Sequence, residues 1–147
     1  MRFVKFEPGH LFAFEAQDAQ KPYLQWTSPD IAKTCAAHFS FTGIDDRGRI
    51  VGCAGLAPWQ DGALAAWAVF SPSIHTHARA VLRAVRSGLD LHRTRTIVAY
   101  VAPEHVKAAR FAEALDFSLS GRDELPNGQS VLRYAREAKW TPERSLS

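Results

Sequence analysis

Three histidines and one tyrosine are the side chains whose positions could point to acid–base or metal chemistry in this chain. His75 and His77 flank one residue at the start of a predicted helix, where they point in different directions, and no nearby cysteine or carboxylate completes a metal site. His105 opens a later predicted helix, where it could act as acid or base, touch a ligand or face solvent. Tyr100 alternates into an apolar strand, which favours a core role over a catalytic one. We therefore expect no metal and take His105 as the single candidate for proton transfer.

Arginines form a strip on the longest predicted helix, at spacings of four, three and seven residues: Arg79, Arg83, Arg86 and Arg93. Such a strip is most often a solvated helix face, although it could also receive phosphate groups or nucleic acid. Arg79 lies nearest the helix start and is the best candidate ligand for an anion. No aromatic platform is interleaved with the arginines, so nucleic acid is not expected as a partner.

The composition is that of one ordinary domain of 147 residues, with 46% hydrophobic and 22% charged residues. No apolar run approaches the roughly 18 residues of a membrane span, and the N-terminus does not resemble a signal peptide, so we expect a cytoplasmic protein. The net charge of +3 suits an anionic small molecule. Cys35 and Cys53 are expected to be buried, reduced thiols. We expect the domain to cover residues 1–138 and a polar tail to follow over 139–147.

A strand–helix–strand unit over residues 61–101 is the centre of the predicted fold. After a turn at Asp61-Gly62, the sequence predicts an apolar strand over Ala63–Phe70, an amphipathic helix over Ile74–Leu91 and a second strand over Thr96–Val101. Such a unit nearly always pairs in parallel with a right-handed crossover. The start of its helix leaves N–H groups unpaired, so this is where a phosphate-bearing ligand should bind.

The flanking segments predict an α/β fold with a mixed sheet of about seven strands and four helices. The other strands are expected over Arg2–Phe6, Phe41–Asp45, Arg49–Leu56, Phe117–Ser120 and Ser130–Ala135. The other helices are expected over Leu11–Gln20, after Ser28 with an inner stripe of Ile31, Cys35 and Phe39, and after Pro103 with an inner face of Ala108, Phe111, Ala112 and Leu115. The glycines of Arg49–Leu56 indicate a place where a ligand or another backbone comes close.

This order of elements resembles the acetyltransferases of the GNAT superfamily over Arg2 to about Glu137. In that fold the fourth and fifth strands splay apart and acyl-CoA lies between them. Its pantetheine pairs with the fourth strand, and its pyrophosphate lies on the amides that open the next helix. By this resemblance the residues that bind acetyl-CoA, or another acyl-CoA, would be Trp67, Ala68, Val69, Phe70, Ser71, Ser73, Thr76, His77, Ala78 and Arg79.

Four shorter stretches are similar to divergent, phage-encoded members of this superfamily: Ala66–Ser71, Arg83–Arg86, Phe111–Phe117 and Tyr134–Arg136. This finer resemblance implies a host cytoplasm or a virion as the location.

The phosphate loop departs from the GNAT pattern of Gln or Arg, two residues, Gly, one residue, and Gly or Ala. The aligned residues are Ser73, Thr76 and Ala78, of which only Ala78 fits. A side chain in place of the first glycine adds a β-carbon where the main chain approaches phosphate.

The catalytic groups depart from the pattern as well. His105 and Ala112 stand where many members carry an Asn and the Tyr that protonates the thiolate, and Asp116 replaces a customary glycine. From Arg49 to Ser73 the only carboxylate is Asp61, in a turn, so these strands offer no evident base.

The resemblance implies an acyl-CoA-dependent N-acetyltransferase with a small-molecule or protein amine as acceptor. The amine would attack a thioester carbonyl held against the main chain of Val69 and Phe70, with positioning supplying most of the rate. The departures favour the alternative, a catalytically degenerate phage structural, virion-associated or interaction protein. The acceptor, a homodimer and virion partners are left open.

Overall fold

The computed structural model describes residues 1–18, 20–21, 28–125 and 128–139. Its strands are β1 (Arg2–Lys5), β2 (Ser40–Ile44), β3 (Ile50–Pro58), β4 (Leu64–Phe70), β5 (Ile97–Val101), β6 (Ser118–Glu124) and β7 (Ser130–Arg136). Its α-helices are α2 (Pro29–Ala36), α3 (Ala78–Leu91) and α4 (Val106–Ala114). Short 3-10 helices are η1 (Pro8–Phe12), η2 (Gln60–Gly62) and η3 (Pro72–Thr76).

All seven strands belong to one sheet in the order β1-β2-β3-β4-β5-β7-β6. The β4–β5 pair is parallel, and the other five pairs are antiparallel. The helix α3 connects the two parallel strands, as a crossover must. The predicted mixed α/β sheet and its central strand–helix–strand unit are therefore confirmed.

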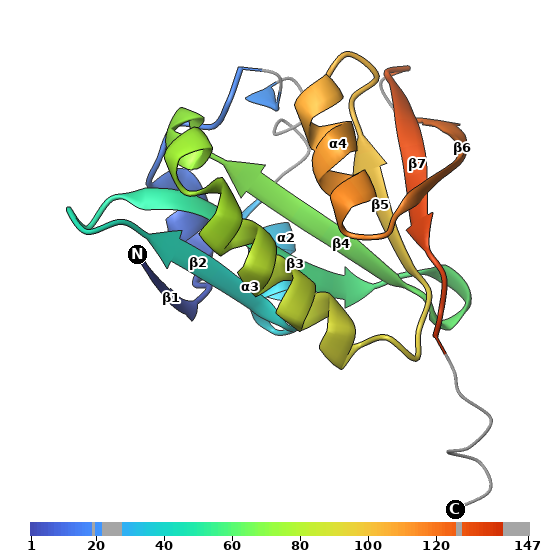
Figure 1. Cartoon of the computed structure of the whole chain (residues 1–147), viewed down its shortest axis with the longest axis horizontal. Coiled ribbons are helices and arrows are strands. Elements are labelled where there is room, and N and C mark those ends of the chain that lie inside the picture. Colours follow the sequence, from blue (N-terminus) through green and yellow to red (C-terminus); the bar gives the residue numbers. More distant parts are fainter. Residues whose placement is uncertain (19, 22–27, 126–127, 140–147) are drawn as a thin grey trace, which may run out of the picture.

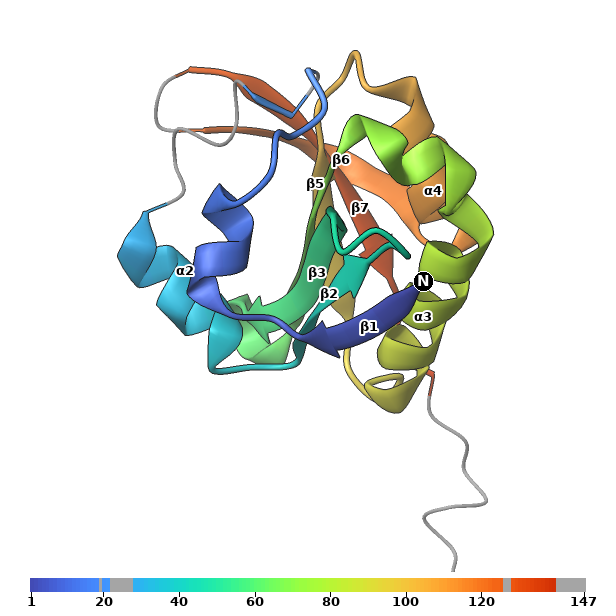
Figure 2. The same ribbon diagram turned by 90° about the vertical axis from the view of Figure 1, so that its left-hand side faces the viewer.

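Helices cover both faces of the sheet. Figure 1 shows α3 and α4 on one face, and Figure 2 shows η1 and α2 on the other. Side chains of β4 alternate between these layers. Leu64 joins the main core beneath α3 and α4, whereas Trp67 packs against Phe6 on the opposite face, with ring centroids 5.0 Å apart. The two layers thus meet at β4.

The three α-helices of the described residues form for the reasons that the sequence indicates. Ser28 caps α2, because its Oγ accepts a hydrogen bond from the N–H of Ile31 at 3.2 Å. On α3, Val81 and Leu89 are buried at helical spacing. The inner face predicted for the last helix is also confirmed, because Ala112 and Leu115 are buried and Ala108 and Phe111 pack against them.

Two helix predictions are wrong in detail. No α-helix spans Leu11–Gln20; a 3-10 turn forms earlier, where Glu7 and His10 cap each other around Pro8. Further along, the Gln17 N–H donates to the carbonyl of Phe70 in β4 instead of to a carbonyl of a preceding helical turn. The described residues therefore contain three α-helices rather than the four expected.

The start of the central helix is also corrected. Ile74 belongs to η3, and α3 begins only at Ala78, because His77 between them has a non-helical backbone with φ of −123° and ψ of 9°.

Exposure corrects three further predictions. Ile31 is 48% exposed, and its neighbour Ala32 faces the sheet instead, since a methyl group lets the short α2 approach closely. Tyr100 is 36% exposed and is not a core residue. Cys35 is half-buried, whereas Cys53 is buried, and both are free thiols.

The sixth strand continues to Glu124, beyond the predicted Ser120. It pairs on one side with β7 alone, and such an edge tolerates the charged residues that hid the strand in the sequence. Because it contains Pro22, the segment from Lys21 to Trp26 is expected to be a loop that carries Tyr23 and Trp26, and these two aromatic residues lie outside the described residues.

Candidate active site

The parallel strands β4 and β5 part after a short contact. Their Cα pairs are Leu64 with Ile97, Ala65 with Val98 and Ala66 with Ala99. Beyond Ala66, β4 runs on to Phe70 while β5 diverges from it (Figure 1). Among the residues that the structure describes, no strand pairs with this edge of β4 beyond Ala66.

Alternating main-chain groups of β4 face this gap. The Leu64 N–H donates to Thr96 at the start of β5, while the Ser71 N–H donates to Val51 of β3. Even-numbered residues thus direct their N–H and C=O toward β5, and odd-numbered ones toward β3. Of the expected cofactor contacts, Ala68 and Phe70 point main-chain groups into the gap. Val69 and Ser71 are buried and turn theirs toward β3.

A cavity of about 580 Å³ lies where the strands part. Its walls come from β2, β3, β4, β5, α3 and α4, with Ala68, Phe70, Ala78, Tyr100, His105 and Phe111 among the lining residues. The lining is mostly apolar, which is typical of a small-molecule site with few polar groups.

The side chain of Gln20 occupies the free edge of β4. Its Nε2 donates to the C=O of Ala68 at 2.9 Å, and its Oε1 accepts from the N–H of Phe70 at 2.9 Å. The N–H of Gln17 donates to the C=O of Phe70 at 2.9 Å. Sequence reasoning missed Gln20, because no local pattern indicates that a side chain will complete the edge of a distant strand.

The start of α3 follows the end of β4 through η3. Ser71 Oγ accepts from the Ser73 N–H at 3.3 Å, and Thr76 Oγ1 donates to the Ser73 carbonyl at 3.0 Å. His77 is the N-cap of α3, yet its side chain makes no capping hydrogen bond. Ala78 and Arg79 are exposed in the first turn. The amides of this turn are therefore available to an anion, as expected for a helix start.

His105 is the titratable side chain of the cavity that is best suited to proton transfer. It is the N-cap residue of α4 and lines the cavity. Burial lowers the pKa of His105, Lys107 lowers it further, and Glu104 opposes both. At neutral pH its imidazole is consequently neutral and able to accept a proton. Among the described residues, no carboxylate lines the cavity.

Tyr100 and Trp67 form part of the cavity wall, and Trp59 packs against Tyr100. The Tyr100 ring meets Trp59 edge-on, with centroids 5.8 Å apart. Burial and the nearby Asp123 carboxylate raise the pKa of Tyr100, so its hydroxyl stays protonated at neutral pH. Trp67 also lines the cavity, and its Nε1 is buried without a hydrogen-bond partner among the described residues.

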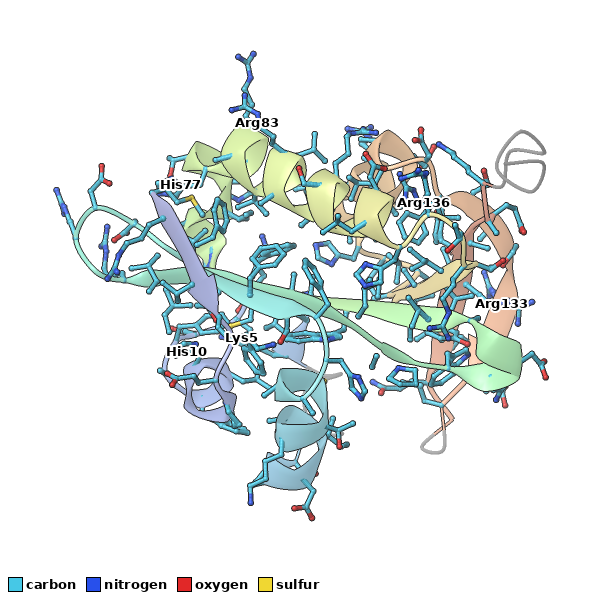
Figure 3. All side chains as sticks on the ribbon, turned by 90° about the horizontal axis from the view of Figure 1, so that it is seen from below. Lys5, His10, His77, Arg83, Arg133 and Arg136 are labelled. Carbon is cyan, nitrogen blue, oxygen red and sulfur yellow. The ribbon has the colours of Figure 1, made fainter. Side chains whose placement is uncertain are left out.

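The arginine strip divides into two parts. Arg86 bonds the Ala114 carbonyl and lies 3.5 Å from an oxygen of Asp116. Arg93 donates to the Asp90 carbonyl at 3.4 Å. Arg79 and Arg83 are exposed, and Arg83 points away from the sheet (Figure 3). Arg79 is therefore the one of the four that combines exposure with a place in the first turn of α3.

No cluster of three or more His, Cys, Asp or Glu side chains suited to a metal ion lies within the part of the chain that the structure describes. In that same part, no helix has the length and apolarity needed to cross a membrane.

Several acetyltransferases among the solved structures have a fold similar to that of this chain. No protein-family model matches the chain, and no curated protein matches its sequence. Ard1 from Thermoplasma volcanium superposes with a TM-score of 0.71 at 11% identity, covering 95% of this chain and 98% of that one. A GNAT-family acetyltransferase from Staphylococcus aureus superposes with a TM-score of 0.65 at 15% identity, covering 94% of this chain and 99% of that one. A GNAT-family acetyltransferase from Bacillus anthracis superposes with a TM-score of 0.63 at 16% identity, covering 90% of this chain and 92% of that one. The chain therefore has the fold of the GNAT acetyltransferases.

Proposed function

We propose that this protein is an N-acetyltransferase that takes its acyl group from acetyl-CoA or another acyl-CoA and transfers it to an amine. The observation that carries the proposal is the parting of β4 and β5, which leaves main-chain groups of Ala68 and Phe70 facing a cavity of about 580 Å³. An extended chain with amide groups, such as pantetheine, fits a free strand edge of this kind.

The described residues suit the pantetheine and the pyrophosphate of the cofactor. The edge of β4 offers hydrogen-bonding groups to the pantetheine amides, and the apolar cavity suits its methylene chain. The uncapped start of α3 and the exposed Arg79 suit the pyrophosphate. Ser73, Thr76, His77 and Ala78 lie between these two regions.

Chemistry at the site would depend mainly on positioning and on one base. Acyl-CoA supplies the acyl group as a thioester. The Phe70 N–H faces the cavity, where Gln20 Oε1 accepts it in the ligand-free protein; once released, it could donate to one carbonyl oxygen of the cofactor, whereas the Val69 N–H is directed to β3. His105, neutral at working pH, would accept the proton that the attacking amine loses. Because Ala112 stands in the wall instead of a tyrosine, the departing thiolate would take its proton from solvent or from another group.

The first test is binding of acetyl-CoA by calorimetry and by the shift in melting temperature, up to about a millimolar ligand. Ala78→Leu should abolish binding while leaving the fold intact, because it adds a large side chain at the start of α3 inside the cavity. Ser87→Leu is the matched control, since Ser87 is exposed on the same helix.

Two outcomes separate the proposal from the alternative of a non-catalytic, interaction or virion-associated protein. If acetyl-CoA gives neither heat nor a melting shift, the enzyme assignment fails. If it binds but no member of an amine panel releases CoA thiol, the protein is a binder and not an enzyme. Unchanged affinity in Ala78→Leu would place the site elsewhere.

A further inference from the structure

We propose that the Gln20 side chain is an internal substitute for a cofactor amide, which must leave β4 before acyl-CoA can pair with that strand. This inference rests on the proposed function and concerns how the same site is regulated. Gln20 would then set the affinity for the cofactor without touching it in the bound state.

The hydrogen bonds of Gln20 reproduce those of a parallel neighbouring strand. In a parallel ladder, one residue donates to a carbonyl of the next strand and accepts from the N–H two residues further on. Gln20 does this with a single side-chain amide, donating to Ala68 and accepting from Phe70, both at 2.9 Å. It therefore continues the β4–β5 pattern into the gap where β5 has diverged.

A cofactor amide and the Gln20 side chain cannot both accept a hydrogen bond from the Phe70 N–H. A backbone N–H carries one hydrogen, so the Phe70 N–H that donates to Gln20 Oε1 is no longer available to a ligand. The Ala68 carbonyl has two lone pairs and could be shared. Competition is thus centred on the Phe70 N–H.

The hydrogen bonds of Gln20 also explain why β4 can be stable without a neighbouring strand along this edge. Polar main-chain groups facing an apolar cavity need partners; when no ligand is bound, Gln20 supplies them for the Ala68 carbonyl and the Phe70 N–H, and the Gln17 N–H supplies one for the Phe70 carbonyl. A side chain can withdraw by changing rotamer within nanoseconds, whereas a backbone strand cannot leave without local unfolding. Gln20 is therefore a reversible cap on the strand.

Because of this cap, only the fraction of molecules with a free Phe70 N–H can bind the cofactor amide. The apparent dissociation constant equals the intrinsic one divided by that fraction. If the cap is closed in most molecules, Gln20→Ala should tighten acetyl-CoA binding about five- to tenfold. Gln20→Leu, which keeps bulk but lacks the amide, should tighten it in the same direction.

The decisive experiment compares three probes by calorimetry on the whole protein. Acetyl-CoA carries both the amides and the phosphates, pantetheine carries only the amides, and the nucleotide half of CoA carries only the phosphates. Gln20→Ala should tighten acetyl-CoA and pantetheine and leave the nucleotide half unchanged. Gln17→Ala is the control, because Gln17 bonds Phe70 through its backbone N–H, which the substitution retains.

Amide hydrogen exchange gives a readout that needs no activity. In the ligand-free protein, the Phe70 amide should exchange faster in Gln20→Ala than in the wild type, and pantetheine should restore protection. Equal exchange in the two proteins would overturn the cap, as would acetyl-CoA binding that is unchanged or weaker in Gln20→Ala. If neither acetyl-CoA nor the nucleotide half binds either protein, the proposed function itself fails. That result is distinct from a cofactor that binds without regard to Gln20.

Discussion

His105 combines two properties that a general base needs, a place in the cavity wall and a pKa held low by burial. It lies at the N-cap of α4, on a different element from the β4 edge where the acyl group would lie. If it is the base, its loss should affect the chemical step more than the binding of acyl-CoA.

His105→Gln is therefore expected to lower kcat about 100-fold while leaving the affinity for acetyl-CoA within about twofold. In the wild type, kcat/KM should rise with pH through a value below 6.5, the ordinary pKa of histidine, because the base must lose its proton first. The variant should lack this limb of the pH profile. A variant with wild-type kcat and pH profile would show that His105 has no part in proton transfer.

The lowered pKa of His105 also makes the stability of the fold depend on pH. Stability, like kcat/KM, should fall as the pH falls. Between the lowered value and about 6.5, the unfolded chain binds more protons at His105 than the folded protein does. The stability linked to the neutral imidazole is thus present above about pH 6.5 and is lost as the pH falls through the folded pKa.

Arg136 is the buried cation that joins the end of β7 to the helices. Its side chain is 3% exposed, its Nε donates to the Leu115 carbonyl at 3.0 Å, and its Nη2 lies 2.6 Å from Asp90. The hydrogen bond from Arg136 is the main reason that the pKa of Asp90 is lowered. Arg136 thus links three separate elements.

Arg136→Leu should lower the free energy of unfolding by about 1–3 kcal/mol, because it leaves the Leu115 carbonyl without its partner and removes an ion pair of which only the cation is buried. Urea titrations would measure the change. Arg83→Leu, on an exposed arginine that points to solvent, should stay within about 0.5 kcal/mol (Figure 3). Equal effects at the two positions would contradict this role for Arg136.

Strand β3 contains two glycines at positions where a side chain would meet neighbouring segments. A β-carbon at Gly55 would lie 2.6 Å from the Phe39 carbonyl oxygen. One at Gly52 would lie 2.4 Å from Cδ1 of Phe70 and 2.8 Å from the Val69 carbonyl oxygen. The sequence-based expectation that these glycines mark a close approach is confirmed, and neighbouring chain segments make the approach.

Gly52→Ala should therefore destabilise the protein by about 1–3 kcal/mol, because β4 or the Phe70 ring must shift to admit the methyl group. Thermal or urea unfolding gives the measurement. Gly9→Ala is the control, since nothing lies within 4 Å of a β-carbon there, and its stability should hardly change. A stable Gly52→Ala protein would mean that β4 yields easily at its free end.

The strands, apart from the charged second half of β6, and the two longer described helices could be predicted because apolar periodicity decides them. The Val81 to Leu89 face of α3 is an example, since the same residues that set the pattern make the core. The segment after Leu11 could not be predicted, because its main chain bonds to β4, more than fifty residues away along the sequence. Local propensity carries no information about such a partner.

For the molecule as a whole, the order of elements was enough to indicate the sheet and the gap, since parallel pairing follows from a strand–helix–strand unit. The location of a groove beside Phe70 and Ala78 followed from that topology. The topology did not predict which main-chain groups of β4 face the groove, or that a side chain is bonded to them. Which β4 residues face the gap depends on register, and the presence of Gln20 at the edge depends on tertiary packing.

The short seam between β4 and β5 has a consequence for the order in which the chain folds. Strands β2, β3 and β4 pair with neighbours in sequence, whereas the seam joins Leu64 to Ile97 through three Cα pairs. Closing a long loop for so few contacts is unfavourable until α3 and α4 have packed across both halves. We expect pulse-labelled amides of the β2–β3 hairpin to become protected earlier in refolding than those of the seam, so that the gap between β4 and β5 is the last part of the sheet to take shape.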